Sequence, residues 1–216
     1  MNLDKLKPLA LDVPAFYQAQ ADATRDVRVT LDQGQTLRRT ASARSFLDMT
    51  GARNAALQLD HLPDTGESVH GIMRGNFAGF DFVPAVLRLA GCAIVELNVA
   101  TLGFKDVHAS ELVTLMDAGD VGRVSFICSH FYKSHEGEVY DSLHAALTQR
   151  GGRCLAMRCH AKLLLFELAD GRHFALEMSA NLRSCNNLEQ FVFTHDTDLV
   201  RFHRGWMDRV LTEAGA

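Results

Sequence analysis

Three features that would place a chain in a functional class at once are missing from this sequence. It has no run of about eighteen apolar residues, so no segment is expected to span a bilayer. Its N-terminus, MNLDKLKPLALDVPAF, carries charges and prolines where a secretory signal would be apolar. Basic residues are not in excess, since 22 Lys and Arg stand against 26 Asp and Glu. A polyanion would therefore have to be held by a local positive patch.

Paired cysteine motifs are also absent. The five cysteines are odd in number and scattered, without a C-x-x-C pair or an H-E-x-x-H sequence: Cys92, Cys128, Cys154, Cys159 and Cys185. Cys128 with His130, or Cys159 with His160, comes nearest to a metal-binding pattern, but neither has the further ligands that zinc requires. We expect reduced thiols, no metal and a cytoplasmic protein.

Secondary-structure signals are weaker in the first part of the chain than in the rest. Residues 1–66 show mixed signals, including a candidate strand at 26–31, and end in the turn-forming run LPDTGES. We interpret them as an N-terminal extension or small subdomain. From residue 67 onward, apolar helical patterns alternate with buried strand patterns. Helices are expected at 80–91, 108–119 and 137–152, and strands at 92–102 and 121–132.

The order of elements changes after residue 152. Two strands, at 153–168 and 172–181, are joined around Asp170-Gly171, which is typical of a type I′ hairpin. A further strand at 189–194 precedes a closing helix at 196–214, capped by Asp196 or Thr197. The sequence therefore predicts an α/β fold, with a mixed, largely parallel β-sheet flanked by helices.

The hairpin begins and ends with polar residues where packing alone would favour apolar ones. It begins with His160 and Lys162 in the sequence HAK, and ends with Ser179 and Asn181 in SAN. Residues two apart in a strand share a face. Four polar groups are therefore expected to converge at one end of the hairpin.

These residues resemble the motif of the phospholipase D superfamily, H-x-K…D…G-S-x-N with a downstream N-x-E. His160, Lys162, Ser179 and Asn181 match the motif, and Asn187 and Glu189 match the downstream element. With its ordered context, the resemblance covers residues 68–214.

Two positions depart from the family pattern: Glu167 stands for the family's Asp, and Met178 for its Gly. The hairpin is also longer by an even number of residues. An even insertion keeps the two polar pairs on facing positions.

The resemblance implies a metal-independent phosphodiesterase without a cofactor, in residues 67–216. His160 is the expected nucleophile and would form a phosphohistidine, which divides one difficult step into two. Lys162, Asn181 and Ser179 would contact the phosphate oxygens, and Glu189 would orient the imidazole. Glu167 and Asn187 are expected to support the site.

The mechanism needs a second histidine as general acid, but the sequence holds no second H-x-K. In the single-motif branch of the family, two chains each contribute one set of residues. We therefore expect a homodimer with one composite site. That branch includes nucleases, which makes a nucleic acid the expected substrate.

Further candidates follow the expected strand at 121–132 and flank the hairpin. Ligands of open α/β sheets bind outside the carboxyl ends of strands, which points to His130, Tyr132 and Lys133. Tyr132 and its neighbour Phe131 are candidates for stacking on bases. Arginines near the hairpin are candidates for the local positive patch: Arg153, Arg158, Arg172 and Arg183.

Two other functions stay open at this point. A phospholipase D-type enzyme acting on lipid head groups would use the same residues, but the sequence shows no basic amphipathic helix to contact a membrane. A catalytically silent nucleic-acid-binding module would keep the fold, with Glu167 and Met178 as signs of lost catalysis.

Overall fold

The computed structural model describes residues 36–39, 44–49, 59–183 and 185–216. All of them belong to one compact unit, residues 33–216. The strand expected at 26–31 lies outside the described residues, as does most of the predicted N-terminal extension. The predicted boundary between residues 66 and 67 stays a prediction.

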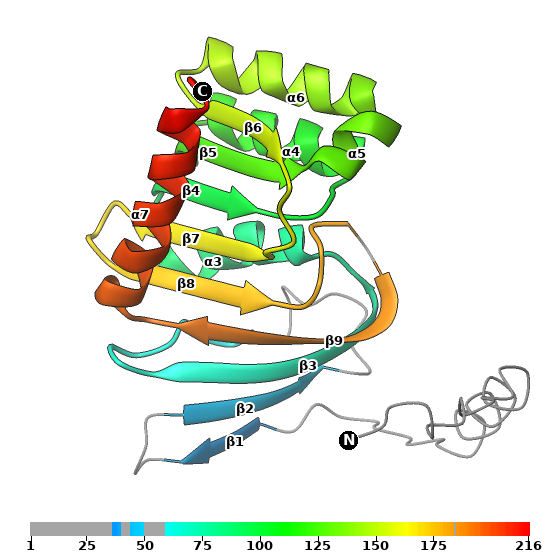
Figure 1. The fold of residues 1–216 in the computed structure, drawn as a ribbon. Coiled ribbons are helices and arrows are strands. Elements are labelled where there is room, and N and C mark those ends of the chain that lie inside the picture. The colour runs from blue at the N-terminus through cyan, green and yellow to red at the C-terminus, as the bar shows by residue number, and fades with distance from the viewer. Residues whose placement is uncertain (1–35, 40–43, 50–58, 184) are drawn as a thin grey trace, which may run out of the picture. The chain divides into compact units, whose positions relative to one another are not determined.

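A nine-stranded sheet runs through this unit in the order β1-β2-β3-β9-β8-β7-β4-β5-β6 (Figure 1). The first strands are β1 (Thr36–Arg39), β2 (Arg44–Met49), β3 (Ser68–Phe77) and β4 (Ile94–Ala100). The later strands are β5 (Val121–Ser129), β6 (Arg153–Met157), β7 (Leu163–Leu168), β8 (His173–Met178) and β9 (Cys185–Thr194).

The α/β class with a mixed sheet flanked by helices is confirmed, but the sheet is not largely parallel. Parallel pairing joins β2 to β3, β4 to β5 and β5 to β6. The other five pairings are antiparallel. The reason lies in the connections: helices carry the chain across between β4, β5 and β6, whereas β7, β8 and β9 follow one another through short turns.

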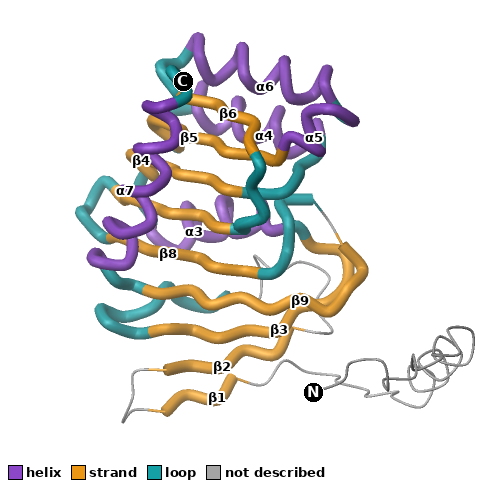
Figure 2. Tube along the Cα trace, in the orientation of Figure 1, coloured by secondary structure: helices purple, strands orange, loops and turns teal. Residues whose placement is uncertain are grey.

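Helices cover both faces of the sheet (Figure 2). One face carries α3 (Phe82–Ala90), preceded by the short 3₁₀ helix η2 (Gly79–Asp81), together with α4 (Asp106–Asp117) and α6 (Gly137–Gln149). The short helix α5 (His130–His135) follows β5 directly. The opposite face carries α7 (Thr197–Glu213), which is capped by Asp196, one of the two residues expected to do so. None of the described helices is long and apolar enough to cross a bilayer.

Side chains of the central strands alternate between two cores. On β7, Leu164 and Phe166 are buried in the core under α3, α4 and α6. Leu163 and Leu165 are buried in the core under α7. This alternation explains why β7 is almost continuously apolar: both of its faces are covered.

Two local expectations need correction. The strand expected at 153–168 is interrupted, because residues 158–162 form a connection between β6 and β7. The hairpin turn has three residues, Ala169 to Gly171, rather than the two of a type I′ turn. The Gly171 N–H donates to the Leu168 carbonyl (3.0 Å), and Gly171 has φ 85°. A three-residue loop closed by a left-handed glycine is a common alternative geometry.

Candidate active site

The predicted site residues lie at the edge of the sheet where β4, β5 and β6 end. Since β7 is antiparallel to β4, it begins at this same edge, and β8 ends there. The connection from β6 to β7 therefore passes the carboxyl ends of β5 and β4, as Figure 1 shows. His160 and Lys162 lie in this connection, just before β7, and not within a strand as expected.

The two halves of the motif meet through the backbone. The Met178 N–H donates to the Lys162 carbonyl (3.1 Å), which extends the β7–β8 ladder by one residue. Ser179 follows directly after β8. The backbone of the His160–Lys162 pair therefore runs beside the backbone of the Ser179–Asn181 pair, at the spacing of neighbouring strands, about 5 Å.

His160 is exposed, and its contact in the described structure is Lys162. The Lys162 ammonium donates to the His160 Nδ1 atom (2.9 Å) and to the His160 carbonyl oxygen (2.9 Å). An ammonium has donors only, so Nδ1 must accept and the proton of the neutral imidazole is on Nε2. The lysine therefore sets the tautomer of the histidine in this state.

Ser179 is tied to β9. Its hydroxyl donates to Glu189 Oε2 through a short hydrogen bond and accepts from the Gln190 N–H (3.0 Å). We expected Glu189 to orient His160, but among the described residues no hydrogen bond joins the two. Glu189 instead fixes the serine hydroxyl at the site.

Asn181 is half-buried and held on both sides. Its Oδ1 atom accepts from the Leu102 N–H (3.2 Å), in the loop after β4. Its carbonyl accepts from the Gly79 N–H (3.0 Å), at the start of η2. With Oδ1 occupied by this loop, the amide group keeps its Nδ2 donors for a ligand. Sequence reasoning missed Leu102 and Gly79, because both act through the backbone and leave no motif.

Glu167 lies at the opposite end of β7 from Lys162, about 17 Å away at the rise of a strand. There it pairs with Arg204 of α7, and His173 Nε2 lies 3.8 Å from its other oxygen. Arg204 also binds Glu96 of β4 (3.0 Å). Glu167 thus supports the docking of α7 and is remote from the predicted phosphate.

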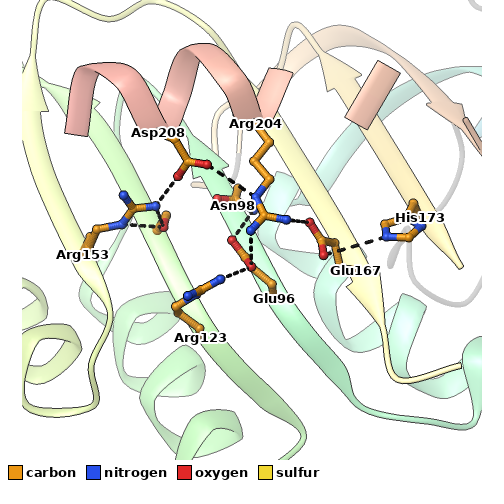
Figure 3. Close-up of polar contacts among 9 residues, drawn as sticks. Glu96, Asn98, Arg123, Arg153, Glu167, His173, Arg204 and Asp208 are labelled. Atoms are coloured by element: carbon orange, nitrogen blue, oxygen red, sulfur yellow. Dashed lines mark hydrogen bonds and ion pairs between the residues drawn. The ribbon is translucent and has the colours of Figure 1, made fainter. Parts of the chain in front are cut away.

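The cluster around Glu167 is larger than this pair (Figure 3). Arg123 binds Glu96, and Arg153 binds Asp208, which also lies 3.5 Å from Arg204 Nε. We call this set the α7 ion cluster: Glu96, Arg123, Arg153, Glu167, Arg204 and Asp208. Its three acids and three arginines balance in charge. A signal was present in the sequence, since Glu96 and Glu167 are the only charged residues of β4 and β7.

The candidates on α5 divide between the surface and the core. His130 is exposed and begins the helix, whose first turn is capped by Ser129 (Tyr132 N to Ser129 Oγ, 3.0 Å). Tyr132 is 5% exposed and packs on Phe104, so it is closed to a base. Lys133 makes a cation–π contact with Tyr140, with its Nζ atom 4.5 Å from the ring centroid.

The expected positive patch is smaller than the sequence suggested. Arg153 belongs to the α7 ion cluster, and Arg172 pairs with Asp170 (2.6 Å). Arg158 and Arg183 are exposed and make no ion pair within the described part of the chain. Asn187 is exposed on β9. Of the candidate arginines in the described part of the chain, Arg158 and Arg183 are therefore the ones available at the site edge, together with Lys162.

The cysteines beside the site are held as neutral thiols. Burial raises the pKa of Cys128 to about 12 and that of Cys154 to about 12. Burial also raises the pKa of Cys159, which precedes His160. Within the described ranges, no group of three or more His, Cys, Asp or Glu side chains is arranged to hold a metal ion.

These pKa values predict a labelling pattern. At pH 8, iodoacetamide should leave Cys128 and Cys154 of the native protein unmodified, because the reactive thiolate is scarce and both side chains are buried. The half-buried Cys92 and Cys159 should react first. Peptide mass spectrometry before and after denaturation measures this, and native labelling of Cys128 at the rate of Cys92 would contradict it.

No family model matches the chain, and the curated proteins include none with significant sequence similarity to it. Several solved structures are similar to the chain, among them a polyphosphate kinase and a phospholipase D family member. The crystal structure of polyphosphate kinase from Porphyromonas gingivalis is 16% identical with a TM-score of 0.45, over 67% of this chain and 26% of the kinase. This chain thus spans about a quarter of the kinase.

The second structure is Nuc from Salmonella typhimurium, described as a phospholipase D family member. It is 16% identical with a TM-score of 0.45, over 66% of this chain and 94% of Nuc.

Proposed function

We propose that the protein is a phosphodiesterase that cleaves nucleic acid through a phosphohistidine at His160. The observation that carries the proposal is the exposed imidazole of His160, hydrogen-bonded to Lys162, at a sheet edge shared with Ser179 and Asn181. A nucleophile, a cation and short hydrogen-bond donors are what phosphoryl transfer requires.

The first step transfers the phosphoryl group to the protein. A ring nitrogen of His160 attacks phosphorus, a P–N bond forms, and the bond to the leaving oxygen breaks. Nδ1 is blocked by Lys162 in the structure described, and Nε2 carries the proton. A phosphate oxygen that draws the ammonium away frees Nδ1 to accept that proton, and Nε2 then has the lone pair it needs.

The second step restores the protein. Water attacks the phosphohistidine, the P–N bond breaks, and the phosphate monoester leaves. A second histidine protonates the leaving oxygen in the first step and takes a proton from water in the second. We propose that it is His160 of a second copy, so that a homodimer forms one composite site. No step requires a metal ion.

Cleavage assays with excess EDTA test the proposal. The chain is incubated with single-stranded DNA, RNA and bis(p-nitrophenyl) phosphate, and quenching at early times in alkali traps the acid-labile phosphohistidine for mass spectrometry. Cleavage that persists in EDTA, with phosphate on His160, is the expected result. Cleavage that stops on chelation, or a covalent phosphate on another residue, would reject the mechanism.

Hydrolysis of phosphatidylcholine vesicles with no cleavage of nucleic acid would assign the same site to lipid. Binding of nucleic acid without turnover of any of these substrates would identify a silent module.

A further inference from the structure

Helix α5 presents one aromatic side chain to solvent at the edge of the candidate active site. Phe131 is 66% exposed, although it is flanked in sequence by the buried Tyr132. Exposing a whole phenyl ring forgoes the favourable free energy of burying it. Of these two neighbouring rings, α5 packs Tyr132 into the core and leaves Phe131 in solvent.

The Phe131 ring is held in place. The imidazole of His135, one turn later, lies against it with 4.1 Å between centroids and an interplanar angle of 32°. His135 is itself fixed, because its Nδ1 atom is 2.8 Å from the Phe131 carbonyl oxygen and 3.1 Å from the Ser134 hydroxyl. A ring that is already oriented loses little conformational entropy when a ligand stacks on it.

Phe131 and His160 follow two neighbouring strands at the same edge of the sheet. Ser129, the last residue of β5, is the register partner of Met157, the last residue of β6. Phe131 is two residues beyond Ser129, and His160 is three beyond Met157. At 3.8 Å per residue and about 5 Å between strands, the two Cα atoms are at most about 24 Å apart. A strand of a few nucleotides spans that distance.

Positive charge accompanies the ring. Arg183 is exposed two residues after Asn181, on the chain that leaves β8 at this edge. Arg158 is exposed in the connection that also carries His160. A phosphodiester strand that enters the site thus meets cations for its phosphates and an aromatic face for a base.

We infer that Phe131 is a stacking platform for an unpaired base of the substrate, a few nucleotides from the scissile phosphate. The inference rests on the proposed function and narrows it to single-stranded nucleic acid, or to duplex with unpaired bases. Bases inside a duplex are stacked on both faces and offer none to the ring. Stacking tolerates any base, so little sequence preference is expected.

Binding measurements separate this role from packing. The chain with His160→Ala keeps its substrate intact, and its affinity for a fluorescent single strand and for an abasic strand of equal length is measured in EDTA. Adding Phe131→Ala should weaken binding of the base-bearing strand by about 5- to 100-fold and leave the abasic strand unaffected. Phe131→Trp should restore affinity.

Phe202 supplies a matched control. It is 68% exposed, lies on α7 at the opposite face of the sheet, and also has a histidine ring beside it, that of His203 at 5.1 Å. Phe202→Ala should leave both affinities unchanged.

Four results would overturn the inference. These are equal losses for both strands, no loss at all, a change in oligomeric mass with Phe131→Ala, and a loss confined to phospholipid vesicles. Cleavage by the chain with His160 intact is scored separately. If binding depends on Phe131 but no substrate is cleaved, only the proposed reaction is rejected. If the substrate is cleaved but Phe131→Ala does not change the affinity, only the stacking role is rejected.

Discussion

Replacing His160 with alanine is expected to lower the rate of phosphodiester cleavage by roughly a thousandfold or more, the scale seen when a covalent nucleophile is removed. The loss should appear in kcat, since Lys162, Asn181 and Ser179 still bind the phosphate. Because the imidazole is exposed and its hydrogen bond in the described part of the chain is to Lys162, unfolding by urea should be nearly unchanged. Initial rates in EDTA and a urea titration measure the two effects.

His144→Ala is the matched control, because His144 is exposed on α6 and has no place in the proposed site. Its cleavage rate should equal that of the unaltered chain. If His160→Ala kept a tenth of the activity or more, the nucleophile would have to be sought elsewhere, with the Ser179 hydroxyl beside Glu189 as the next group to test.

Mixing the two forms tests the composite site. In a homodimer, each site needs one His160 as nucleophile and the other as acid. After subunit exchange in an equal mixture of unaltered chain and His160→Ala, only about a quarter of the dimers retain both histidines. Activity should fall to a quarter of that of unaltered chain at the same total concentration. A fall to half would show that each chain works alone, and would direct attention to His130 as an acid in the same subunit.

The sequence indicated the elements whose signals are local. The helix expected at 80–91 ends at Gly91, which has φ 66°, and Asp196 caps α7 through hydrogen bonds to the N–H groups of Asp198 and Leu199. The pairing of Lys162 with the end of β8 also followed from sequence, since the even insertion preserves register. Periodicity, capping and parity all act over a few residues.

Other features depended on partners distant in sequence. Phe131 and Tyr132 are both aromatic neighbours in the sequence, and it is Tyr132 that packs on Phe104 and is buried. One of the antiparallel pairings joins β9 to β3, a strand that sequence reasoning overlooked. The orientation of Glu189 toward Ser179 is a similar case, since it depends on how β9 meets the turn after β8.

The α7 ion cluster shows the same dependence on distant partners and gives the largest expected effect on stability. Arg204 joins two carboxylates whose side chains are 6% and 16% exposed, those of Glu96 and Glu167. Glu96 keeps Arg123 if Arg204 is lost, whereas Glu167 keeps only His173 at 3.8 Å. A buried carboxylate left without its partner is costly, because its desolvation is no longer offset.

Arg204→Met should therefore lower the free energy of unfolding at pH 7 by roughly 2–4 kcal/mol, at or below the cost of breaking a fully buried pair because Arg204 is itself 34% exposed. Chemical unfolding followed by circular dichroism measures the change. Adding Glu167→Gln to Arg204→Met should recover part of the loss, since a neutral amide needs no counter-charge.

Arg201→Met is the control for this effect on the same helix. Arg201 pairs with Asp198, but the two side chains are 73% and 87% exposed, so water already solvates both charges. Its loss should cost no more than about 0.5 kcal/mol. Equal costs for Arg201→Met and Arg204→Met would mean that burial of Glu96 and Glu167 contributes nothing to the role of Arg204. A recovery with Glu167→Gln would trace the difference to the unpaired carboxylate, because that substitution removes the charge and leaves the packing of α7 on the sheet intact.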